Sequence, residues 1–285
     1  MIEVFDEDLH AGVNLALEVG EILYREKTEH QDLMIFENNR FGRVMSLDGA
    51  VQTTEHDEFI YHEMFAHVPM LAHGKVERVL IIGGGDGGAA CQVLKHKTVK
   101  ATLVDIDRTV IDLSAKYMPT VSDGAFDDPR LEIIVADGCQ FVKDTDQKWD
   151  VIIIDSTDPH GPGEVLYSAE FYADCKTCLT DGGVIVTQNG VPFVQGEELR
   201  NSYDRLGALF ADVSFYMAAI PSYVGGALAF GWATDNKDLR KIETGKLAER
   251  FLDADIETGY YSPEIHQAAF VLPYFVQKIL TAEKD

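Results

Sequence analysis

The sequence predicts an α/β protein in which a small N-terminal antiparallel β unit precedes an open, mostly parallel sheet. From residue 76 onward, apolar strand-like runs alternate with helical segments, which is typical of βαβ units. A glycine-rich turn, Gly83–Gly88, follows the first of these runs, Val79–Ile82. We therefore expect two domains: residues 1–75, a β domain with a connecting helix, and residues 76–285, a larger α/β domain.

The first domain contains short runs of strand-forming residues separated by polar turns such as Asn38–Arg40 and Asp48-Gly49. A helical spacing of apolar residues follows over Asp57–His67. We expect this helix to end near Pro69, because proline removes a backbone donor and disfavours helical geometry in the residue before it. The predicted strands are Glu21–Glu26, Leu33–Glu37, Phe41–Leu47 and Val51–Thr54.

In the second domain the predicted strands and helices alternate in chain order. The strands are Val79–Ile82, Ala101–Val104, Leu131–Val135, Val151–Ile154 and Val184–Gln188. The helices are Ala89–Lys95, Thr109–Tyr117, Cys139–Lys143, Ala169–Leu179 and Glu197–Phe210. A long loop is expected after Ile154. Two further strands, Val213–Ala219 and Ala227–Ala233, are expected to close the sheet as a hairpin.

The glycine-rich turn indicates a ligand site at the end of the first parallel strand. Glycines let the backbone turn tightly and approach a ligand, and the helix that follows favours anions at its N-terminus. Asp86 is unusual in this setting because it places a carboxylate in the loop. We expect that carboxylate to bind a cation.

Acidic residues follow each of the first four predicted strands of the second domain. They are Asp86, Asp105, Asp137 and Asp155. Any one of them alone is explained by an ordinary helix N-cap, but four together favour a shared site, because open α/β sheets bind ligands at the carboxyl ends of their strands. Asp158 adds a second carboxylate three residues after Asp155, in a loop rich in proline and glycine.

The net charge of −24, from 24 basic and 48 acidic residues, argues against nucleic-acid or anionic-membrane partners. It fits either the steering of cationic substrates or solubility in salt, and charge does not decide between them. No apolar run reaches the length of a membrane span, and the first residues lack a secretion signal. Four cysteines suggest a reducing compartment, so we expect a cytoplasmic protein.

Other motifs have simpler explanations. His62 and His67 are five residues apart, so they do not share a helix face, and we expect no metal site. Cys175 and Cys178 form a lone C-x-x-C for which core packing is the better interpretation. Tyr260-Tyr261 fits either an interface or the core, and we favour the core.

Several stretches in the same order resemble the spermidine synthases, a family of polyamine aminopropyltransferases, over nearly the whole chain. They are Tyr24–Leu33, Phe41–Thr54, Asp57–Met64, Val79–Gly88, Asp155–Gly163, Thr187–Gly190, Ile220–Tyr223 and Tyr260–His266. The resemblance implies a class I methyltransferase-like (Rossmann-like) sheet behind a small β domain. It also implies a homodimer or homotetramer.

The resemblance further implies that an aminopropyl group passes from decarboxylated S-adenosylmethionine to putrescine, giving spermidine and methylthioadenosine without a cofactor. The residues implied as catalytic are Asp155, which would accept the proton, and Tyr61. The residues implied for the donor are Gln31, Gly83, Gly85, Asp86, Asp105, Asp137, Gly138 and Pro162. Those implied for the amine are Tyr61, His62, Asp86, Asp155, Asp158, Gln188 and Tyr223.

Two positions depart from the family pattern, and other functions stay open. Asp105 and Gln92 each stand where the family usually has glutamate. Cadaverine or agmatine could replace putrescine as acceptor. Two other functions are further alternatives: a small-molecule methyltransferase, and a sensor that binds polyamines or nucleosides without turnover. Asp86 speaks against a methyltransferase, because at 4 Å it would repel the carboxylate of S-adenosylmethionine by about 4 kcal/mol.

Overall fold

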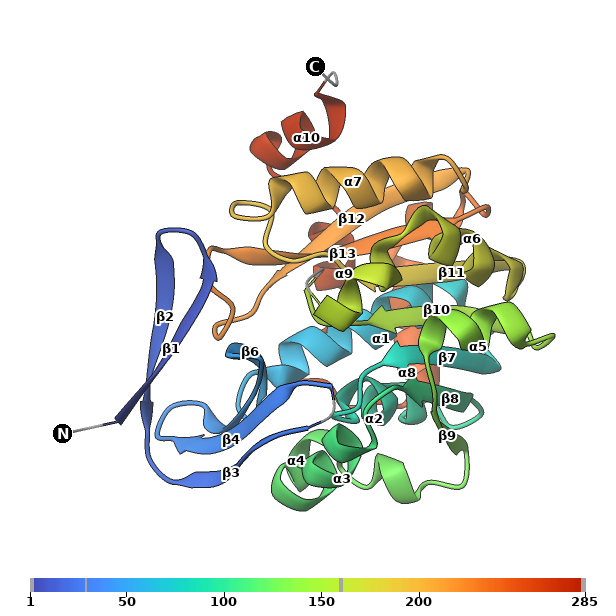
Figure 1. The fold of residues 1–285 in the computed structure, drawn as a ribbon. Helices are drawn as coiled ribbons and strands as arrows, with labels where there is room; N and C mark the ends of the chain where they lie inside the picture. Colours follow the sequence, from blue (N-terminus) through green and yellow to red (C-terminus); the bar gives the residue numbers. More distant parts are fainter. Residues whose placement is uncertain (1–2, 29, 159–160, 283–285) are drawn as a thin grey trace.

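The computed structural model describes residues 3–28, 30–158 and 161–282, with the side chains of residues 161 and 162 excepted. Its strands form a two-stranded hairpin, a four-stranded antiparallel sheet and a seven-stranded sheet. In Figure 1 the hairpin stands beside the large sheet, and the four-stranded sheet lies below the hairpin. This arrangement confirms the predicted mixed fold, with an antiparallel β unit ahead of a mostly parallel sheet.

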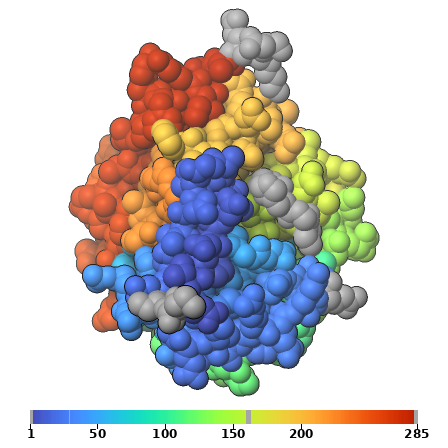
Figure 2. Space-filling view, turned by 60° about the vertical axis from the view of Figure 1, so that its left-hand side comes forward, coloured from blue at the N-terminus to red at the C-terminus, as the bar shows by residue number. Residues whose placement is uncertain are grey.

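The N-terminal hairpin, β1 (Glu3–His10) and β2 (Val13–Val19), is an element that our sequence reading missed. β1 carries four acidic residues and has no apolar face, so no strand pattern marks it in the sequence. In β2, apolar residues do alternate with others, at Val13, Leu15, Leu17 and Val19. Leu17 and Val19 are buried against the four-stranded sheet. In Figure 2 the hairpin, in dark blue, lies across the face of the molecule.

The four-stranded sheet comprises β3 (Ile22–Lys27), β4 (Asp32–Asn38), β5 (Gly42–Leu47) and β6 (Ala50–Thr54), close to the predicted strands. Alternating residues of β4 face opposite cores: Met34 and Phe36 pack toward the hairpin, and Leu33 and Ile35 pack toward helix α3 (Arg108–Tyr117). The sheet is therefore held between the hairpin and the α/β part of the chain.

Helix α1 runs from Glu58 to His73 and contains Pro69, so the prediction that Pro69 ends this helix was wrong. A proline inside a helix costs about 3 kcal/mol in lost hydrogen bonding and steric conflict. Here every residue from Ile60 to Ala72 is buried, and this packing offsets that cost. The helix ends instead at Gly74, which adopts the left-handed conformation common after helices.

The seven-stranded sheet has the order β12-β13-β11-β10-β7-β8-β9. Its strands are β7 (Arg78–Gly83), β8 (Lys100–Asp105), β9 (Leu131–Val135), β10 (Trp149–Asp155), β11 (Leu179–Gln188), β12 (Asp212–Ala219) and β13 (Ala227–Thr234). β7 to β11 run parallel, and β12 and β13 add the predicted antiparallel pair. The chain winds in opposite directions from β7, so the switch point lies between β7 and β10.

Helices cover both faces of this sheet (Figure 1). One face packs against α1, α2 (Gly88–Leu94) and α8 (Thr244–Ala254), and the other against α5 (Gly138–Asp144), α6 (Ala169–Thr177) and α7 (Gly196–Gly207). The predicted helix Ala169–Leu179 is too long, because β11 already begins at Leu179. As predicted, Cys175, Cys178 and Tyr261 are buried in these cores. Tyr260 is partly buried beside them.

Several short elements lie outside the predicted set. The long loop expected after β10 contains a 3₁₀ helix, η2 (Gly161–Tyr167). The remaining elements are α4 (Pro119–Ser122), η1 (Ala125–Asp127), η3 (Leu239–Lys241), α9 (Pro263–Ala269) and α10 (Tyr274–Thr281). Among the described residues, no helix is both long and apolar enough to cross a membrane.

Candidate active site

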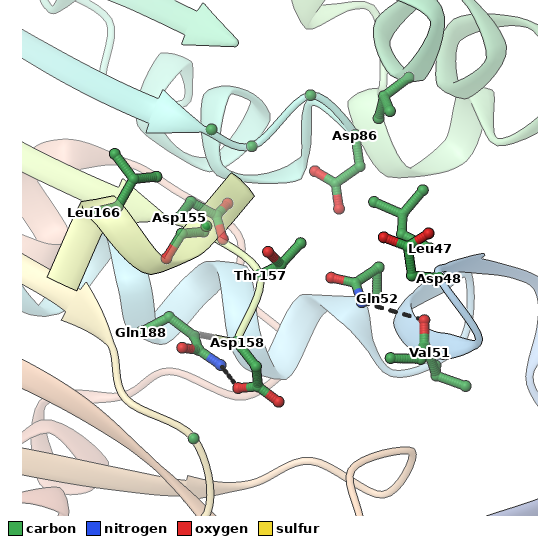
Figure 3. Close-up of a pocket in the computed structure, with 18 of the residues that line it drawn as sticks. Leu47, Asp48, Val51, Gln52, Asp86, Asp155, Thr157, Asp158, Leu166 and Gln188 are labelled. Carbon is green, nitrogen blue, oxygen red and sulfur yellow. Dashed lines mark hydrogen bonds between the residues drawn. The ribbon is translucent and has the colours of Figure 1, made fainter. Parts of the chain in front are cut away.

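A cavity of about 360 Å³ opens between the four-stranded sheet and the carboxyl ends of the parallel strands. It is lined by every predicted site residue except Pro162, whose side chain lies outside the described part of the structure. Figure 3 shows Asp86, Asp155 and Asp158 on different sides of this one space. The residues brought together are Gln31, Tyr61, His62, Gly83, Gly85, Asp86, Asp105, Asp137, Gly138, Asp155, Asp158, Gln188 and Tyr223.

The glycine-rich turn allows the acidic strand ends to approach one another. Gly83 and Gly84 have φ of 80° and 68°, and the Gly84 N–H donates to the Asp155 carbonyl at 3.0 Å. A methyl group on Gly83 would overlap that same carbonyl. One on Gly85 would lie 2.7 Å from Asp105 Oδ2. The turn therefore needs glycine to bring β7 against β10 and β8.

Asp155 ends β10, and its Oδ1 accepts a 2.6 Å hydrogen bond from the Tyr61 hydroxyl of α1. Burial raises the pKa of Asp155 to about 7, and the negative charge of Asp86 adds to the rise. Burial and the Asp155 charge raise the pKa of Tyr61 well above its ordinary value, so Tyr61 stays a hydrogen-bond donor. Asp155 is thus a carboxylate that can take up a proton near neutral pH.

Asp86 sits in the turn after β7, between a backbone amide and a histidine. Its Oδ1 accepts from the Gly88 N–H at 2.9 Å, and its Oδ2 lies 3.5 Å from His62 Nε2. Burial opposes ionisation, but His62 and the Gly88 amide outweigh it and lower the pKa of Asp86. Asp86 is therefore ionised at neutral pH, unlike the half-protonated Asp155.

His62, Asp86 and Asp155 place one ligand atom each within 4.8 Å of the others, a spacing that could hold a metal ion. Both nitrogens of His62 already face carboxylates, because Nδ1 lies 2.6 Å from Glu58 Oε2. An imidazole must offer a free lone pair to bind a metal. The contacts of His62 fit an ion-pair network better than a metal centre.

Asp158 is oriented by residues on the opposite wall of the cavity. Gln188, at the end of β11, donates through Nε2 to Asp158 Oδ1 at 3.1 Å (Figure 3). Gln188 Oε1 in turn lies 2.5 Å from the hydroxyl of Tyr167 in η2. Tyr167 is a positioning residue that sequence reasoning missed, because nothing in the loop after β10 predicted a helix.

The opposite end of the cavity carries groups suited to a nucleoside. Burial raises the pKa of Asp105 to about 6, and its Oδ1 accepts from the Asp107 N–H at 2.8 Å. Asp107 also accepts from Thr28 Oγ1 at 3.0 Å and from Gln31 Nε2 at 3.2 Å. These bonds tie the β3–β4 loop to the turn after β8, and they leave the side-chain amide oxygen of Gln31, Oε1, as an acceptor for a ligand.

Asp137 also has a structural task. Its Oδ1 accepts from the Cys139 and Gln140 amides at 2.7 and 3.1 Å, which makes it the N-cap of α5. The N-cap explanation therefore holds for this strand end, and Asp137 with Gly138 lines the cavity as well.

Glu7 is a cavity residue that comes from the missed hairpin. It is 6 % exposed, and its Oε2 accepts from the Val51 N–H at 2.6 Å. Burial raises the pKa of Glu7; the Val51 amide opposes the rise and the charge of Asp158 adds to it. The sequence offered one signal for Glu7, an acidic residue in the middle of an extended segment. Recognising it as a cavity residue would have required predicting strand β1 and its pairing, because that pairing directs the side chain inward.

Tyr223 closes the wall beside Tyr61, and their rings lie 6.1 Å apart. Its hydroxyl donates to the Gln52 carbonyl at 2.6 Å, and the neighbouring Ser222 N–H donates to Asp57 Oδ2 at 2.7 Å. Gln52 itself lines the cavity and was not predicted. These contacts join the loop before β13 to β6 and to the start of α1.

Comparison with known proteins identifies the family. The family model described as "Spermine/spermidine synthase domain" matches residues 58–242, which is more than half of the chain. The chain belongs to the spermine/spermidine synthase family. A second family model, "Spermidine synthase tetramerisation domain", matches residues 4–55, which contain the hairpin and the four-stranded sheet. The family's oligomerisation segment thus supplies Glu7 and Gln31 to the cavity.

Similar proteins cover almost the whole chain. Polyamine aminopropyltransferase 1 of Pseudomonas aeruginosa is 53% identical over 273 residues, 95% of this chain and 96% of that protein. The Shigella sonnei polyamine aminopropyltransferase is 52% identical over 278 residues, 97% and 96% of the two chains.

Two solved spermidine synthase structures are also similar. One is a complex with the transition-state analogue AdoDATO, at a TM-score of 0.93 and 38% identity, covering 99% of this chain and 96% of that one. The other is from Thermotoga maritima, at a TM-score of 0.91 and 38% identity, covering 99% and 95%. These matches confirm the family and fold that the sequence resemblance implied.

Proposed function

We propose that this protein transfers the aminopropyl group of decarboxylated S-adenosylmethionine to putrescine, which gives spermidine and methylthioadenosine. The observation that carries this proposal is the convergence of Asp86, Asp155 and Asp158 on one cavity beside a nucleoside-type end. Relatives named polyamine aminopropyltransferase support it.

The position of the donor follows from the charged and hydrogen-bonding groups on the cavity walls. Asp105 and Gln31 bind the ribose and base end, together with Asp137, Gly138 and the proposed contact at Pro162. The Gly83–Gly85 backbone lets the sulfonium lie close to the turn. The donor's ammonium then meets Asp86, which is ionised and part of a network with one net negative charge.

The reaction is a displacement at the carbon next to the sulfonium. The amine nitrogen forms the C–N bond while the C–S bond breaks and its electron pair leaves with sulfur as a neutral thioether. A neutral leaving group needs no acid, and we propose that no cofactor takes part. The cavity contributes mainly by positioning the two reactants.

The attacking amine must lose a proton, and Asp155 accepts it. Moving a proton from an ammonium of pKa about 10.4 to a carboxylate near 3.9 spans about 6.5 units, or roughly 9 kcal/mol. The pKa of Asp155, raised to about 7 by burial, shortens that gap to about 3.4 units, or roughly 5 kcal/mol. The remaining free-energy difference is overcome because the proton moves to Asp155 while the C–N bond forms, when the amine becomes more acidic.

The rest of the acceptor binds along the wall that carries Asp158, Gln188 and Tyr223. The charge of Asp158 contributes to the raised pKa of Glu7, so the two carboxyl groups lie near each other, and together they offer oxygen acceptors to the distal ammonium. Putrescine carries ammonium groups at both ends and fits this two-ended arrangement. Cadaverine and agmatine are the alternative acceptors.

We also propose a homotetramer, with a homodimer as the alternative, supported by the tetramerisation-domain match. A cytoplasmic location is supported by the four cysteines, all of which are free thiols.

One assay tests the reaction. The protein is incubated with putrescine and either decarboxylated or ordinary S-adenosylmethionine, and methylthioadenosine and S-adenosylhomocysteine are quantified. We expect methylthioadenosine and spermidine from the decarboxylated donor. S-adenosylhomocysteine would indicate a methyltransferase, and binding without any product would indicate a sensor. Repeating the assay with cadaverine and agmatine ranks the acceptors.

A further inference from the structure

His62 occupies an unusual position in this acidic cavity, because a carboxylate lies at each of its ring nitrogens. Nδ1 is 2.6 Å from Glu58 Oε2, and Nε2 is 3.5 Å from Asp86 Oδ2. A neutral imidazole has a single N–H and would leave one nitrogen lone pair facing a carboxylate. Only the imidazolium carries an N–H toward both partners, so the geometry favours the charged form.

The ring is also held in place from the sides. His62 is buried, and a methyl group on Gly88 would overlap its ring, so the glycine turn leaves room for the imidazole and little more. The Tyr61 ring packs against it edge-on at 5.1 Å. Both ring nitrogens of His62 are therefore engaged by carboxylates, and the contact with the acceptor amine that the family resemblance implies stays a prediction.

Glu58 completes this arrangement from outside the cavity. It precedes His62 by one helical turn on α1, and it is absent from the cavity lining. Burial alone would lower the pKa of His62, but Asp86 and Glu58 raise it well above its ordinary value. Other titratable groups also face the His62–Asp86 contact. They are Asp155 on β10, Asp105 on β8, the Cys91 thiol on α2, and the phenols of Tyr61 and Tyr223.

We propose that Glu58 is a positioning residue for donor recognition: it holds His62 as an imidazolium against Asp86, and so fixes the carboxylate that meets the donor's ammonium. This inference rests on the proposed function. Two carboxylates around one imidazolium leave a single net negative charge, which matches one ammonium. Without the Glu58 charge, the His62–Asp86 pair has no net charge, so it no longer complements the positive charge of the donor's ammonium.

The test compares Glu58→Gln with the wild type across pH 6.5 to 9. We expect the donor KM to rise roughly tenfold or more at neutral pH, as for the loss of a charged hydrogen bond, with a smaller change in kcat. Methylthioadenosine lacks the ammonium, so its affinity should stay within about twofold by calorimetry. Glu58→Asp keeps the charge and should restore part of the donor affinity.

A second readout follows His62 directly. In ¹³Cε1-histidine-labelled protein, with the His62 signal assigned by its loss in His62→Gln, we expect an imidazolium shift throughout this pH range in the wild type. In Glu58→Gln the signal should titrate. The matched control is Asp112→Asn, which removes an exposed carboxylate at the same i,i+4 spacing from Arg108 and should change neither readout.

The outcomes separate this inference from the proposed function. An unchanged donor KM in folded Glu58→Gln, or a raised KM with an unmoved His62 signal, would overturn the inference. A titrating His62 signal in the wild type would do the same, and it remains measurable if Glu58→Gln does not fold. Failure of the wild type to form methylthioadenosine would instead overturn the proposed function.

Discussion

The Tyr61 hydroxyl donates a 2.6 Å hydrogen bond to Asp155 Oδ1, and this contact joins the buried helix α1 to the end of the central strand β10. It leaves the other carboxylate oxygen of Asp155 to face a substrate. The Tyr61 ring packs in a buried aromatic cluster with Phe65 and Phe230, which holds the hydroxyl in place. The hydroxyl in turn orients the Asp155 carboxylate for accepting a proton.

Tyr61→Phe is expected to lower kcat by roughly tenfold, because Asp155 loses the hydrogen bond that orients and stabilises its charged form. The apparent pKa of the acidic limb of the rate profile should move upward by about one unit. Steady-state rates across pH check both effects. A variant with wild-type kcat and an unmoved limb would show that this hydrogen bond has no part in the reaction.

The wild-type pH profile follows from Asp155 itself. Its pKa is raised to about 7 by burial and by Asp86, and only the ionised form accepts a proton. Values of kcat/KM should therefore be highest above pH 7 and fall about tenfold per unit below it. Asp155→Asn should lower turnover by orders of magnitude and keep most of the methylthioadenosine affinity. A flat profile from pH 5 to 8 would remove Asp155 as the proton acceptor.

Gly83→Ala is expected to destabilise the fold by several kcal/mol, because the added methyl overlaps the Asp155 carbonyl and φ is +80°. Chemical denaturation measures the change. Gly207→Ala is the matched control, since a methyl there meets nothing within 4 Å and φ is not positive. Equal stabilities for the two variants would contradict the packing of the turn against β10.

Asp107→Asn is expected to weaken methylthioadenosine binding by roughly tenfold, because the carboxylate that accepts from both Thr28 and Gln31 loses its charge. The contacts of the amine do not include this network, so the KM for putrescine should stay constant. Calorimetry with methylthioadenosine, and kinetics at saturating donor, separate the two. A rise in the putrescine KM with unchanged methylthioadenosine affinity would contradict the assignment of Gln31 to the donor end of the cavity.

Local sequence signals predicted the centre of the site. The glycine turn and the acidic residues at the ends of β7, β8, β9 and β10 are short-range features, and parallel pairing brings such ends together whatever the loops do. The family resemblance added Gln31, Tyr61 and Tyr223, which no local pattern indicated.

Features that depend on tertiary packing could not be predicted in the same way. Glu7 enters the cavity only because the polar strand β1 pairs with β2, and Tyr167 only because the loop after β10 forms η2. Pro69 is tolerated within α1 by burial that its own neighbours in sequence do not reveal. The Glu58–His62–Asp86 network joins α1 to the glycine turn, and the spacing of each segment alone gives no sign of the pairing.

The central claim is that negative side chains in this cavity select positively charged reactants, and Asp86 tests it most directly. The measurement is the ratio of dissociation constants for ordinary and decarboxylated S-adenosylmethionine, in the wild type and in Asp86→Ala. A like-charge contact of about 4 kcal/mol corresponds to a preference of about a thousandfold for the decarboxylated donor. We predict that Asp86→Ala loses most of this preference; an unaltered ratio would contradict the account.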